Sequence, residues 1–396
     1  MEKFDIVMLS TADWDNPFWT NKQHVARELA RRGHRVFYIN SLGLRQPSFN
    51  RSDMKRIAAR LKSFFSRPRQ VEENVIVWSP IVIPLQRFSL VRRINRLSLG
   101  LMIRLLTRCH GFRSPVLWTY NPLTLRLLDV SRYRFLIYHC VDEIKAQPDM
   151  PVLILEESEK RLVEASDVVF VTAPKLFETR QRWNDKTWFF PNVADYRHFS
   201  RANEPSTPVS PVVARLGSPV IGFVGAISGY KVDFPLLEHL ALSRPDYQIV
   251  LVGKIGEGDP YTDIRRLEAL PNVHFPGPAA YADLPGILKG FDVAILPSLL
   301  NEYTANMFPM KFFEYLAAGK PVVATRLEAL SEFQEMVFMA GEEEDFVHQV
   351  DRALEGNSDE RIAARQRLAR EYTYESRTSS MLDLVRHEMT EKESSQ

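Results

Sequence analysis

The residues of this chain best suited to chemistry lie in one short run, PMKFFEYLAAGKPVVAT, which spans residues 309–325. Lys311 and Glu314 are three residues apart, so a helix would place an ammonium group and a carboxylate on the same face, one turn apart. Pro309 is suited to the first turn of such a helix, and Gly319 to the left-handed residue that ends it. A short helix of this kind offers charged side chains and unpaired backbone N–H groups, which suit the binding of an anion.

The neighbouring segments are expected to hold this helix at the edge of a parallel sheet. Residues 321–325 form a short apolar, β-branched run that is typical of a strand covered on both faces. Upstream, residues 293–296 predict another strand, and a polar loop joins it to the helix. In units with this order, ligands bind outside the carboxyl ends of the strands. Because the backbone of Ala305, Asn306 and Met307 leads into the helix, we expect its N–H groups to point toward a bound anion.

At these positions the sequence resembles the GT-B glycosyltransferases, specifically the large retaining family 4 and its branch of teichuronic-acid and other polysaccharide-building enzymes. The resemblance covers most of the chain and implies an α/β fold with two Rossmann-like, doubly wound parallel-sheet domains facing each other across a cleft. Family members usually carry two glutamates separated by seven residues, the first on the donor sugar and the second on the nucleotide ribose. Glu314 matches the second, whereas Asn306 replaces the first. An asparagine amide can hydrogen-bond sugar hydroxyls but carries no charge.

Two alternatives to this assignment stay open. Glu302 is a substitute carboxylate for the absent first glutamate, although its spacing differs from that of the family. Glu314 itself has the alternative interpretation of a solvated helix carboxylate.

The resemblance also implies how the diphosphate of a nucleotide-sugar would be held, since a leaving diphosphate needs cations, N–H groups or a metal. Gly225 follows a predicted strand, and Lys231 lies six residues later. Many family members place a basic residue directly after this glycine and a lysine a few residues on. Ala226 replaces the basic residue, so Lys231 is the predicted diphosphate contact and Lys311 is a second candidate for the missing charge. Each lysine is otherwise explained as a surface residue.

The rest of the predicted donor site comes from neighbouring loops. Gly253 marks the turn of a loop that skirts the expected cleft, and the main chain around Phe275 is expected beside the nucleotide base. The donor-binding and nucleotide-binding set is then Gly225, Lys231, Gly253, Phe275, Asn306, Met307, Lys311 and Glu314.

In the first half of the chain, His139 ends an apolar, strand-like run. Related enzymes often have a histidine in this neighbourhood that approaches the donor sugar, so the resemblance implies a catalytic set of His139, Lys231 and Asn306. A lone histidine after an apolar strand is otherwise a hydrogen-bonded structural residue. Asp142 follows it and is expected on the acceptor side.

The loop after the first predicted strand carries Trp14, Asp15 and Trp19. Aromatic side chains beside polar ones offer a stacking surface for sugar rings or an apolar acceptor, so these residues are predicted on the acceptor side. Ordinary packing is the alternative. Asp13 and Asp15 form a DxD pair, but their position after the first strand of a parallel sheet does not suit metal binding. We expect no cofactor and no essential metal.

Alternating strand and helix patterns predict the domain organisation. We expect an N-terminal, acceptor-side domain over residues 1–200, a proline-rich linker over 201–219 and a C-terminal, nucleotide-sugar-binding domain over 220–375. A long helix from about residue 360 to 388 is expected to reach back, so that residues 376–396 pack on the first domain and end in a polar tail.

Composition narrows the class of protein. The chain has 396 residues, is 45% hydrophobic and carries a net charge of +2, which suits two domains of ordinary size. Cys109 and Cys140 suggest neither a disulfide framework nor a zinc site. With no signal-peptide pattern and no apolar run of spanning length, we expect a cytoplasmic protein that is soluble or peripheral on the inner face of the membrane.

Basic residues are concentrated in one region. Residues 51–113 hold 14 Lys or Arg but 3 Asp or Glu, and two segments place arginines beside apolar residues at helical spacing. This is the pattern of a basic amphipathic helix, so contact with an anionic membrane surface is one hypothesis, and two ordinary surface helices are the other. The region has no recognisable nucleic-acid reader motif, and we expect no nucleic-acid partner.

Together these features predict a retaining, hexosyltransferase-type glycosyltransferase. Its donor would be a nucleoside diphosphate-sugar, and its acceptor a cell-surface polysaccharide or lipid-linked saccharide. A nucleotide-sugar 2-epimerase of the same fold and a non-catalytic, nucleotide-sugar-binding partner subunit are the alternatives. The second is suggested by Ala226 and Asn306, which both replace family features.

Overall fold

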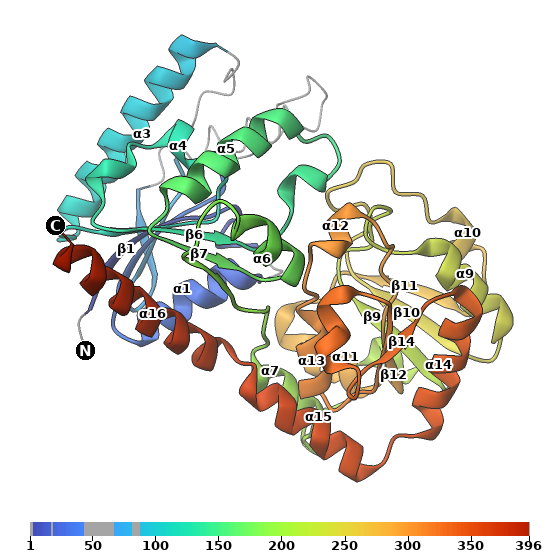
Figure 1. Cartoon of the computed structure of the whole chain (residues 1–396). Helices are drawn as coiled ribbons and strands as arrows, with labels where there is room; N and C mark the ends of the chain where they lie inside the picture. Colours follow the sequence, from blue (N-terminus) through green and yellow to red (C-terminus); the bar gives the residue numbers. More distant parts are fainter. Residues whose placement is uncertain (1–2, 17–18, 43–66, 81–87, 396) are drawn as a thin grey trace. The chain divides into compact units, whose positions relative to one another are not determined.

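The structure is a computed structural model that describes residues 3–16, 19–42, 67–80 and 88–395 (Figure 1). The chain divides into two compact units, the first made of Met1–Phe190 and Thr378–Gln396 and the second of Pro191–Arg377. Each unit contains a largely parallel sheet with helices on both faces. The prediction of two doubly wound α/β domains is confirmed.

The first unit is built on a sheet whose described strands run in the order β3-β4-β2-β1-β5-β6-β7-β8. All neighbouring pairs are parallel except β3 and β4. The strands are β1 Asp5–Leu9, β2 Arg35–Ile39, β3 Arg69–Glu72, β4 Val75–Trp78, β5 Val116–Thr119, β6 Leu136–Cys140, β7 Val168–Val171 and β8 Thr187–Phe189.

Helices cover both faces of this first sheet (Figure 1). One face packs against α3, α4, α5 and α6, and its core includes Val7 and Leu9 of β1 together with Leu99 of α3 and Leu162 of α5. On the other face lie α1 and the end of α16. The helices are α1 Asn21–Arg31, α3 Ser89–Cys109, α4 Thr124–Leu127, α5 Val152–Ala165, α6 Pro174–Arg180 and α16 Tyr374–Ser394.

The second unit has a sheet whose described strands run in the order β11-β10-β9-β12-β13-β14, with every neighbouring pair parallel. The switch of strand order lies between β9 and β12, which is where ligands bind in open α/β sheets. The strands are β9 Val220–Val224, β10 Gln248–Val252, β11 Val273–Gly277, β12 Val293–Leu296, β13 Val322–Thr325 and β14 Phe338–Ala340.

Two separate cores cover the faces of this second sheet. Ile221 and Ile249 point toward α9 and α14, whereas Val220 and Val250, their neighbours along the strands, point toward α11 and α13. Alternation of this kind follows from the two-residue period of a strand. The helices are α7 Tyr196–Phe199, α8 Pro211–Ala214, α9 Phe234–Ser243, α10 Arg265–Glu268, α11 Leu284–Lys289, α12 Glu302–Ala305, α13 Lys311–Ala317, α14 Glu343–Glu355 and α15 Asp359–Glu371.

The described elements differ from the predicted segments at two places. Residues 201–219 belong to the second unit, where Ala202 and Val213 are buried in its core, because the prolines start or flank short helical turns that still pack. The helix expected over 360–388 is two helices, α15 and α16. Tyr372 breaks it with a non-helical backbone (φ −99°, ψ 70°).

Candidate active site at the carboxyl edge of the second sheet

Two glycines follow neighbouring strands at the carboxyl edge of the second sheet. Gly225 follows β9 and Gly253 follows β10, and their backbones pass so closely that a Cβ on Gly253 would lie 1.7 Å from the oxygen of Gly225. The amide of Gly225 donates to Val252 O at 2.8 Å, and that of Gly253 donates to Gly277 O at 3.0 Å. No side chain fits at position 253, so the ends of β9 and β10 meet backbone to backbone at Gly225 and Gly253, which together are called the glycine floor.

Lys311 lies directly against this glycine floor. A Cβ on Gly225 would come within 2.3 Å of Lys311 Cε and 3.0 Å of Lys311 Nζ, so the lysine side chain passes over the Cα of that glycine. Its helix, α13, is fastened to β9 by Tyr315, whose hydroxyl accepts a hydrogen bond of 2.9 Å from the amide of Val224. Because Lys311 and Tyr315 are one turn apart on the helix, this bond holds the ammonium group at the end of β9.

Glu314 lies on the same helix and is only partly exposed. Burial raises the pKa of its carboxyl from 4.5 to about 7, Lys311 lowers this pKa and Asp195 raises it. The group therefore titrates near neutral pH, and a ligand that donates hydrogen bonds to it would favour its charged form. This environment differs from that of the solvated helix carboxylate, which was the alternative interpretation.

Lys231 lies on the loop that joins β9 to α9. This loop is tied to the loop after β12: Leu299 N donates to Lys231 O at 2.9 Å, and Asn301 Nδ2 donates to Tyr230 O at 2.8 Å. The ammonium group of Lys231 lies 5.0 Å from the ring centroid of Tyr230 and 5.1 Å from that of Tyr303 in α12. Two aromatic faces thus hold the Lys231 cation at this edge of the sheet.

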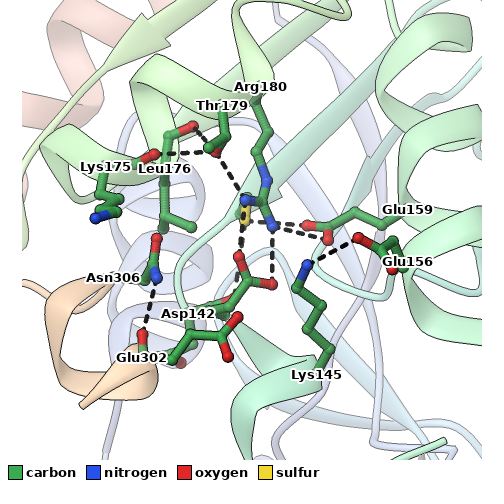
Figure 2. Close-up of polar contacts among 12 residues, drawn as sticks. Asp142, Lys145, Glu156, Glu159, Lys175, Leu176, Thr179, Arg180, Glu302 and Asn306 are labelled. Atoms are coloured by element: carbon green, nitrogen blue, oxygen red, sulfur yellow. Dashed lines mark hydrogen bonds and ion pairs between the residues drawn. The ribbon is translucent and has the colours of Figure 1, made fainter. Parts of the chain in front are cut away.

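Asn306 occupies a structural position at the end of α12. It is buried, and its Nδ2 donates a hydrogen bond of 2.8 Å to Glu302 O, as Figure 2 shows. The Glu302 side chain is exposed. A glutamate at position 306 could not donate this bond, which gives a local reason for the amide.

The prediction for the backbone before α13 needs correction. The amides of Ala305, Asn306 and Met307 do not point outward, because they donate to the carbonyls of Asn301, Tyr303 and Thr304, respectively. These residues form the short helix α12 and its end instead of an open approach to α13. Met307 and Phe275 are both partly exposed. Phe275 packs against the hydrophobic core that lies between the second sheet and helices α9 and α14.

In the first unit, His139 lies inside β6 and is completely buried. Its ring stacks on that of Tyr120 with centroids 4.8 Å apart, and Trp118 Nε1 donates to its Nδ1 at 3.4 Å. Phe170 contacts it edge-on. An aromatic box of this kind is the environment of a structural histidine, which was the alternative to a catalytic role.

The loop after β6 is held by a buried ionic cluster (Figure 2). Arg180 of α6 donates to both oxygens of Glu143, at 2.8 and 3.0 Å, and to Glu159 of α5 at 2.8 Å. All three side chains are less than one-tenth exposed. Burial raises the pKa of Glu143, and hydrogen bonds from Arg180 oppose this shift. The predicted acceptor-side residue Asp142 precedes Glu143 and lies 3.8 Å from the ammonium of Lys22.

The remaining predicted acceptor-side residues are mostly engaged within the first unit. Trp14 is buried and packs edge-on against Trp19 and Tyr38. The ring of Trp19 lies 3.8 Å from the guanidinium of Arg27, and Asp15 forms an exposed ion pair with Arg69. Trp14 therefore fits the packing alternative, while Trp19 and Asp15 lie nearer the surface.

In the part of the chain that the structure describes, no group of three or more His, Cys, Asp or Glu residues is arranged to hold a metal ion. No helix of residues 3–16, 19–42, 67–80 or 88–395 is both long and apolar enough to cross a bilayer. In the basic region, residues 51–66 and 81–87 lie outside the described residues.

The structure places some of the predicted donor residues at one edge of the second sheet. Lys311 lies against Gly225, Glu314 shares its helix, and Lys231 lies on the loop that follows the same strand. Sequence reasoning missed Tyr315 and the pair of Glu159 and Arg180. The spacing of Tyr315 from Lys311 was the available signal for the first, whereas nothing in the sequence marks Glu159 and Arg180 as partners.

One family model and several known proteins match this chain. Residues 218–356, which contain the whole glycine floor and α13, match the family model described as glycosyl transferases group 1. TuaH of Bacillus subtilis (strain 168), whose name assigns it to teichuronic acid biosynthesis as a glycosyltransferase, is 31% identical over 216 residues. This match covers 52% of the present chain and 53% of TuaH, so the chain spans about half the length of the curated relative it matches.

Solved structures show the same fold over nearly the whole chain. Sucrose-phosphate synthase from Thermosynechococcus elongatus superposes with a TM-score of 0.65 at 17% identity, covering 97% of this chain and 99% of that one. Anabaena HepE, solved with UDP and glucose, superposes with a TM-score of 0.64 at 15% identity, covering 96% of this chain and 99% of HepE. The Escherichia coli trehalose-6-phosphate protein bound with UDP-2-fluoro glucose superposes with a TM-score of 0.65 at 11% identity. This match covers 96% of this chain and 98% of that one. The chain therefore has the GT-B fold and resembles the glycosyltransferases of teichuronic acid biosynthesis.

Proposed function

We propose that this protein is a retaining glycosyltransferase that moves a hexosyl group from a nucleoside diphosphate-sugar to a saccharide or lipid-linked saccharide acceptor of a cell-surface polysaccharide. The single observation that carries the proposal is the position of Lys311, whose ammonium group lies over Gly225 at the end of β9. A cation at the carboxyl edge of a parallel sheet, beside the glycine floor, suits a diphosphate.

In this proposal the second unit holds the donor. The diphosphate would lie on the floor made by Gly225 and Gly253, with Lys311 and Lys231 binding its oxygens. Lys311 would take the place of the basic residue that is absent at Ala226. Glu314 would accept hydrogen bonds from the ribose hydroxyls, which are good partners for a carboxylate that is otherwise held partly protonated.

The chemical step would need no protein base. The bond between the anomeric carbon and the diphosphate oxygen breaks, and the acceptor hydroxyl forms a new bond to that carbon on the same face. Its proton passes to the departing phosphate oxygen. The two lysines would stabilise the negative charge that develops on this oxygen, which is where electrostatic stabilisation accelerates such a transfer.

A donor panel tests the proposal. Thermal unfolding is measured with UDP-, GDP-, ADP- and dTDP-sugars, and the sugar that raises the midpoint is then incubated with an acceptor and the product anomer determined by NMR. We expect one base to stabilise the protein and the product to keep the donor's anomeric configuration. An inverted product would refute retention, and an epimer formed from the donor alone would indicate a 2-epimerase.

The non-catalytic alternative is distinguished by the same samples. The observation that favours it is Asn306, whose amide is engaged with Glu302 O and supplies no charge to the site. Donor binding without transfer to any saccharide or lipid-linked acceptor would support that alternative. We further propose that transfer takes place in the cytoplasm, at the inner face of a membrane.

A further inference from the structure

Helix α3 of the first unit exposes an unusual amount of apolar surface. Seven of the sixteen large hydrophobic residues that are exposed among the described ones lie in it or at its N-cap. The most exposed are Leu90 at 68% and Leu97 at 64%. Contiguous exposed apolar residues on this scale mark an interaction surface more often than chance. The seven are Phe88, Leu90, Ile94, Leu97, Leu101, Met102 and Leu105.

The exposed residues form a face of their own. Leu90, Ile94, Leu97, Leu101 and Leu105 recur at intervals of three or four, so they line up along one side of the helix. The residues that α3 buries, Asn95, Leu99, Ile103 and Thr107, recur at intervals of four. At about 100° per residue, these two stripes lie on opposite sides. The packing of α3 onto the sheet therefore uses one apolar face, and a second apolar face of the helix is exposed.

Charge distinguishes what could cover this second face. The sequence of α3 contains five arginines and no acidic residue. Arg93, Arg96, Arg104 and Arg108 are all exposed, and Arg93, Arg104 and Arg108 lie within or beside the apolar stripe by helical geometry. An apolar stripe flanked by arginines matches a surface that is apolar inside and negatively charged outside.

A neighbouring helix adds apolar residues. At the start of α5, Val152, Leu153 and Ile154 are exposed at 47%, 82% and 38%. The short helix α4 packs against both α3 and α5, and Figure 1 shows the three helices on the same face of the first sheet. A second element of the same helical layer thus also exposes apolar side chains.

We infer that the exposed face of α3 docks on an anionic lipid bilayer, with its leucines in the acyl boundary and its arginines at the headgroups. The docking itself is inferred from α3 alone. Its benefit, which is to bring the enzyme to a lipid-linked acceptor, rests on the proposed function. A second copy of this chain is the rival occupant. Self-association through this stripe would bring arginine-rich flanks together without an acidic partner on either helix, which is unfavourable.

The test measures binding of the full chain to vesicles by flotation. Vesicles of phosphatidylcholine alone are compared with vesicles in which a third of the lipid is phosphatidylglycerol, at low and high salt. We expect binding to the anionic vesicles that weakens with salt. A Leu97→Ser/Leu101→Ser variant is expected to bind about tenfold or more weakly, because it removes the apolar part of the contact. An Arg93→Gln/Arg104→Gln variant should bind weakly and lose most of its salt dependence.

The control variant is Leu242→Ser in α9 of the second unit, where the side chain is 62% exposed and arginines do not flank it in that helix. Its vesicle binding should equal that of the unchanged protein. Since all these side chains are exposed, each variant should keep its thermal midpoint and its response to nucleoside diphosphate, which separates this test from that of the proposed function.

Three results would overturn the inference. The first is no binding of the unchanged protein to anionic vesicles at low salt. The second is equal binding by the Leu97→Ser/Leu101→Ser and Leu242→Ser variants. The third is a dimer in sedimentation experiments that Leu97→Ser/Leu101→Ser dissociates, which would assign the face to a second copy of the chain.

Discussion

Lys311 and Lys231 are both predicted diphosphate contacts, but the folded chain places them in different surroundings. Lys231 is held between two tyrosine rings, whereas Lys311 lies over a glycine whose side-chain space it occupies. Position 226, where the family resemblance implies a basic residue, is an alanine. The nearest cation to Gly225 thus comes from a helix 86 positions later in the chain instead of from the adjacent residue.

Replacing Lys311 should therefore weaken nucleotide binding. We expect Lys311→Ala to raise the dissociation constant for the nucleoside diphosphate by about tenfold to a hundredfold, because a charge-assisted contact contributes about 1.5–3 kcal/mol. Lys311→Arg should recover part of this loss. Isothermal titration checks both, with the exposed Lys160→Ala as the matched control. Equal affinity of all four proteins would show that Lys311 does not touch the diphosphate.

Glu314 predicts a distinctive dependence of stability on pH. Its folded pKa of about 7 exceeds the ordinary value of 4.5, so the folded state binds the proton more tightly. This group's contribution to stability is then present at low pH and is lost as the pH rises from 4.5 to 7. Glutamine does not titrate, so in Glu314→Gln this position no longer lowers the stability as the pH rises. Relative to the unchanged protein, the variant should gain on the order of 2 kcal/mol in unfolding free energy between acid and mildly alkaline pH.

Urea unfolding at acid and mildly alkaline pH measures this difference. The same Glu314→Gln variant should bind nucleoside diphosphate more weakly at alkaline pH, where the native carboxylate is charged. A stability difference that does not change with pH would mean that Glu314 titrates normally.

At the scale of elements, the site depends on how closely β9 and β10 approach each other at their ends. A Cβ on Gly253 has no space, since it would fall 1.7 Å from Gly225 O, whereas a Cβ on Gly100 in α3 would meet nothing within 4 Å. These two glycines form a matched pair for one substitution, Gly→Ala, with opposite expected effects.

We expect Gly253→Ala to destabilise the second unit by several kcal/mol and to abolish nucleotide binding, because the two strand ends must move apart. Gly100→Ala should instead stabilise the protein by about 0.5–1 kcal/mol, as alanine does in a helix interior. Thermal unfolding of both variants, with and without nucleotide, provides the measurement. Retained nucleotide binding in Gly253→Ala would contradict the proposed floor.

The ionic cluster of Arg180, Glu143 and Glu159 joins three elements of the first unit, α6, the end of β6 and α5. Arg180→Met would leave two buried carboxylates without their cation, and breaking a buried pair costs about 3–5 kcal/mol. We expect this loss at neutral pH and a smaller one in acid, because burial raises the pKa of Glu143 and favours its uncharged form. Denaturant unfolding across pH checks the difference.

Arg161→Met is the control, because that side chain is exposed and forms an ion pair with Glu157 one turn away along α5. Its cost should stay within about 0.5 kcal/mol. If Arg180→Met were as mild as Arg161→Met, the cluster would not hold these elements together.

Local patterns predicted the elements of this edge well. Residues 293–296 and 322–325 are strands, and Gly319 ends α13 in the left-handed conformation, because β-branched runs and a terminal glycine act through their own backbone. The role of Ala305–Met307 was not predictable in this way. Asn301 and Thr304 form a capping box that starts the short helix α12. The amides of Ala305–Met307 therefore bond to carbonyls in and before α12 and do not point toward a ligand at the start of α13.

At the scale of the whole molecule, strand and helix periodicity predicted two doubly wound units but placed their boundary late. Periodicity reports which residues alternate, whereas the boundary depends on where residues 191–219 find their packing partners. The same limit applies to His139. A strand-end position is visible in the sequence, but the surrounding box comes from two other segments of the first unit, Trp118 and Tyr120 in and directly after β5 and Phe170 in β7.

The two units should also respond differently to nucleotide. If the donor site lies on the second sheet, a nucleoside diphosphate at a hundred times its dissociation constant adds about 2.7 kcal/mol to the stability of the folded state that binds it. Hydrogen exchange should then slow most at amides of residues 225–233, 253–256 and 298–311. The strand amides of β6 and β7 in the first unit serve as the internal reference. Protection centred on the loop after β6, with the second unit unchanged at saturation, would move the nucleotide site to the first unit and refute the assignment of Lys311.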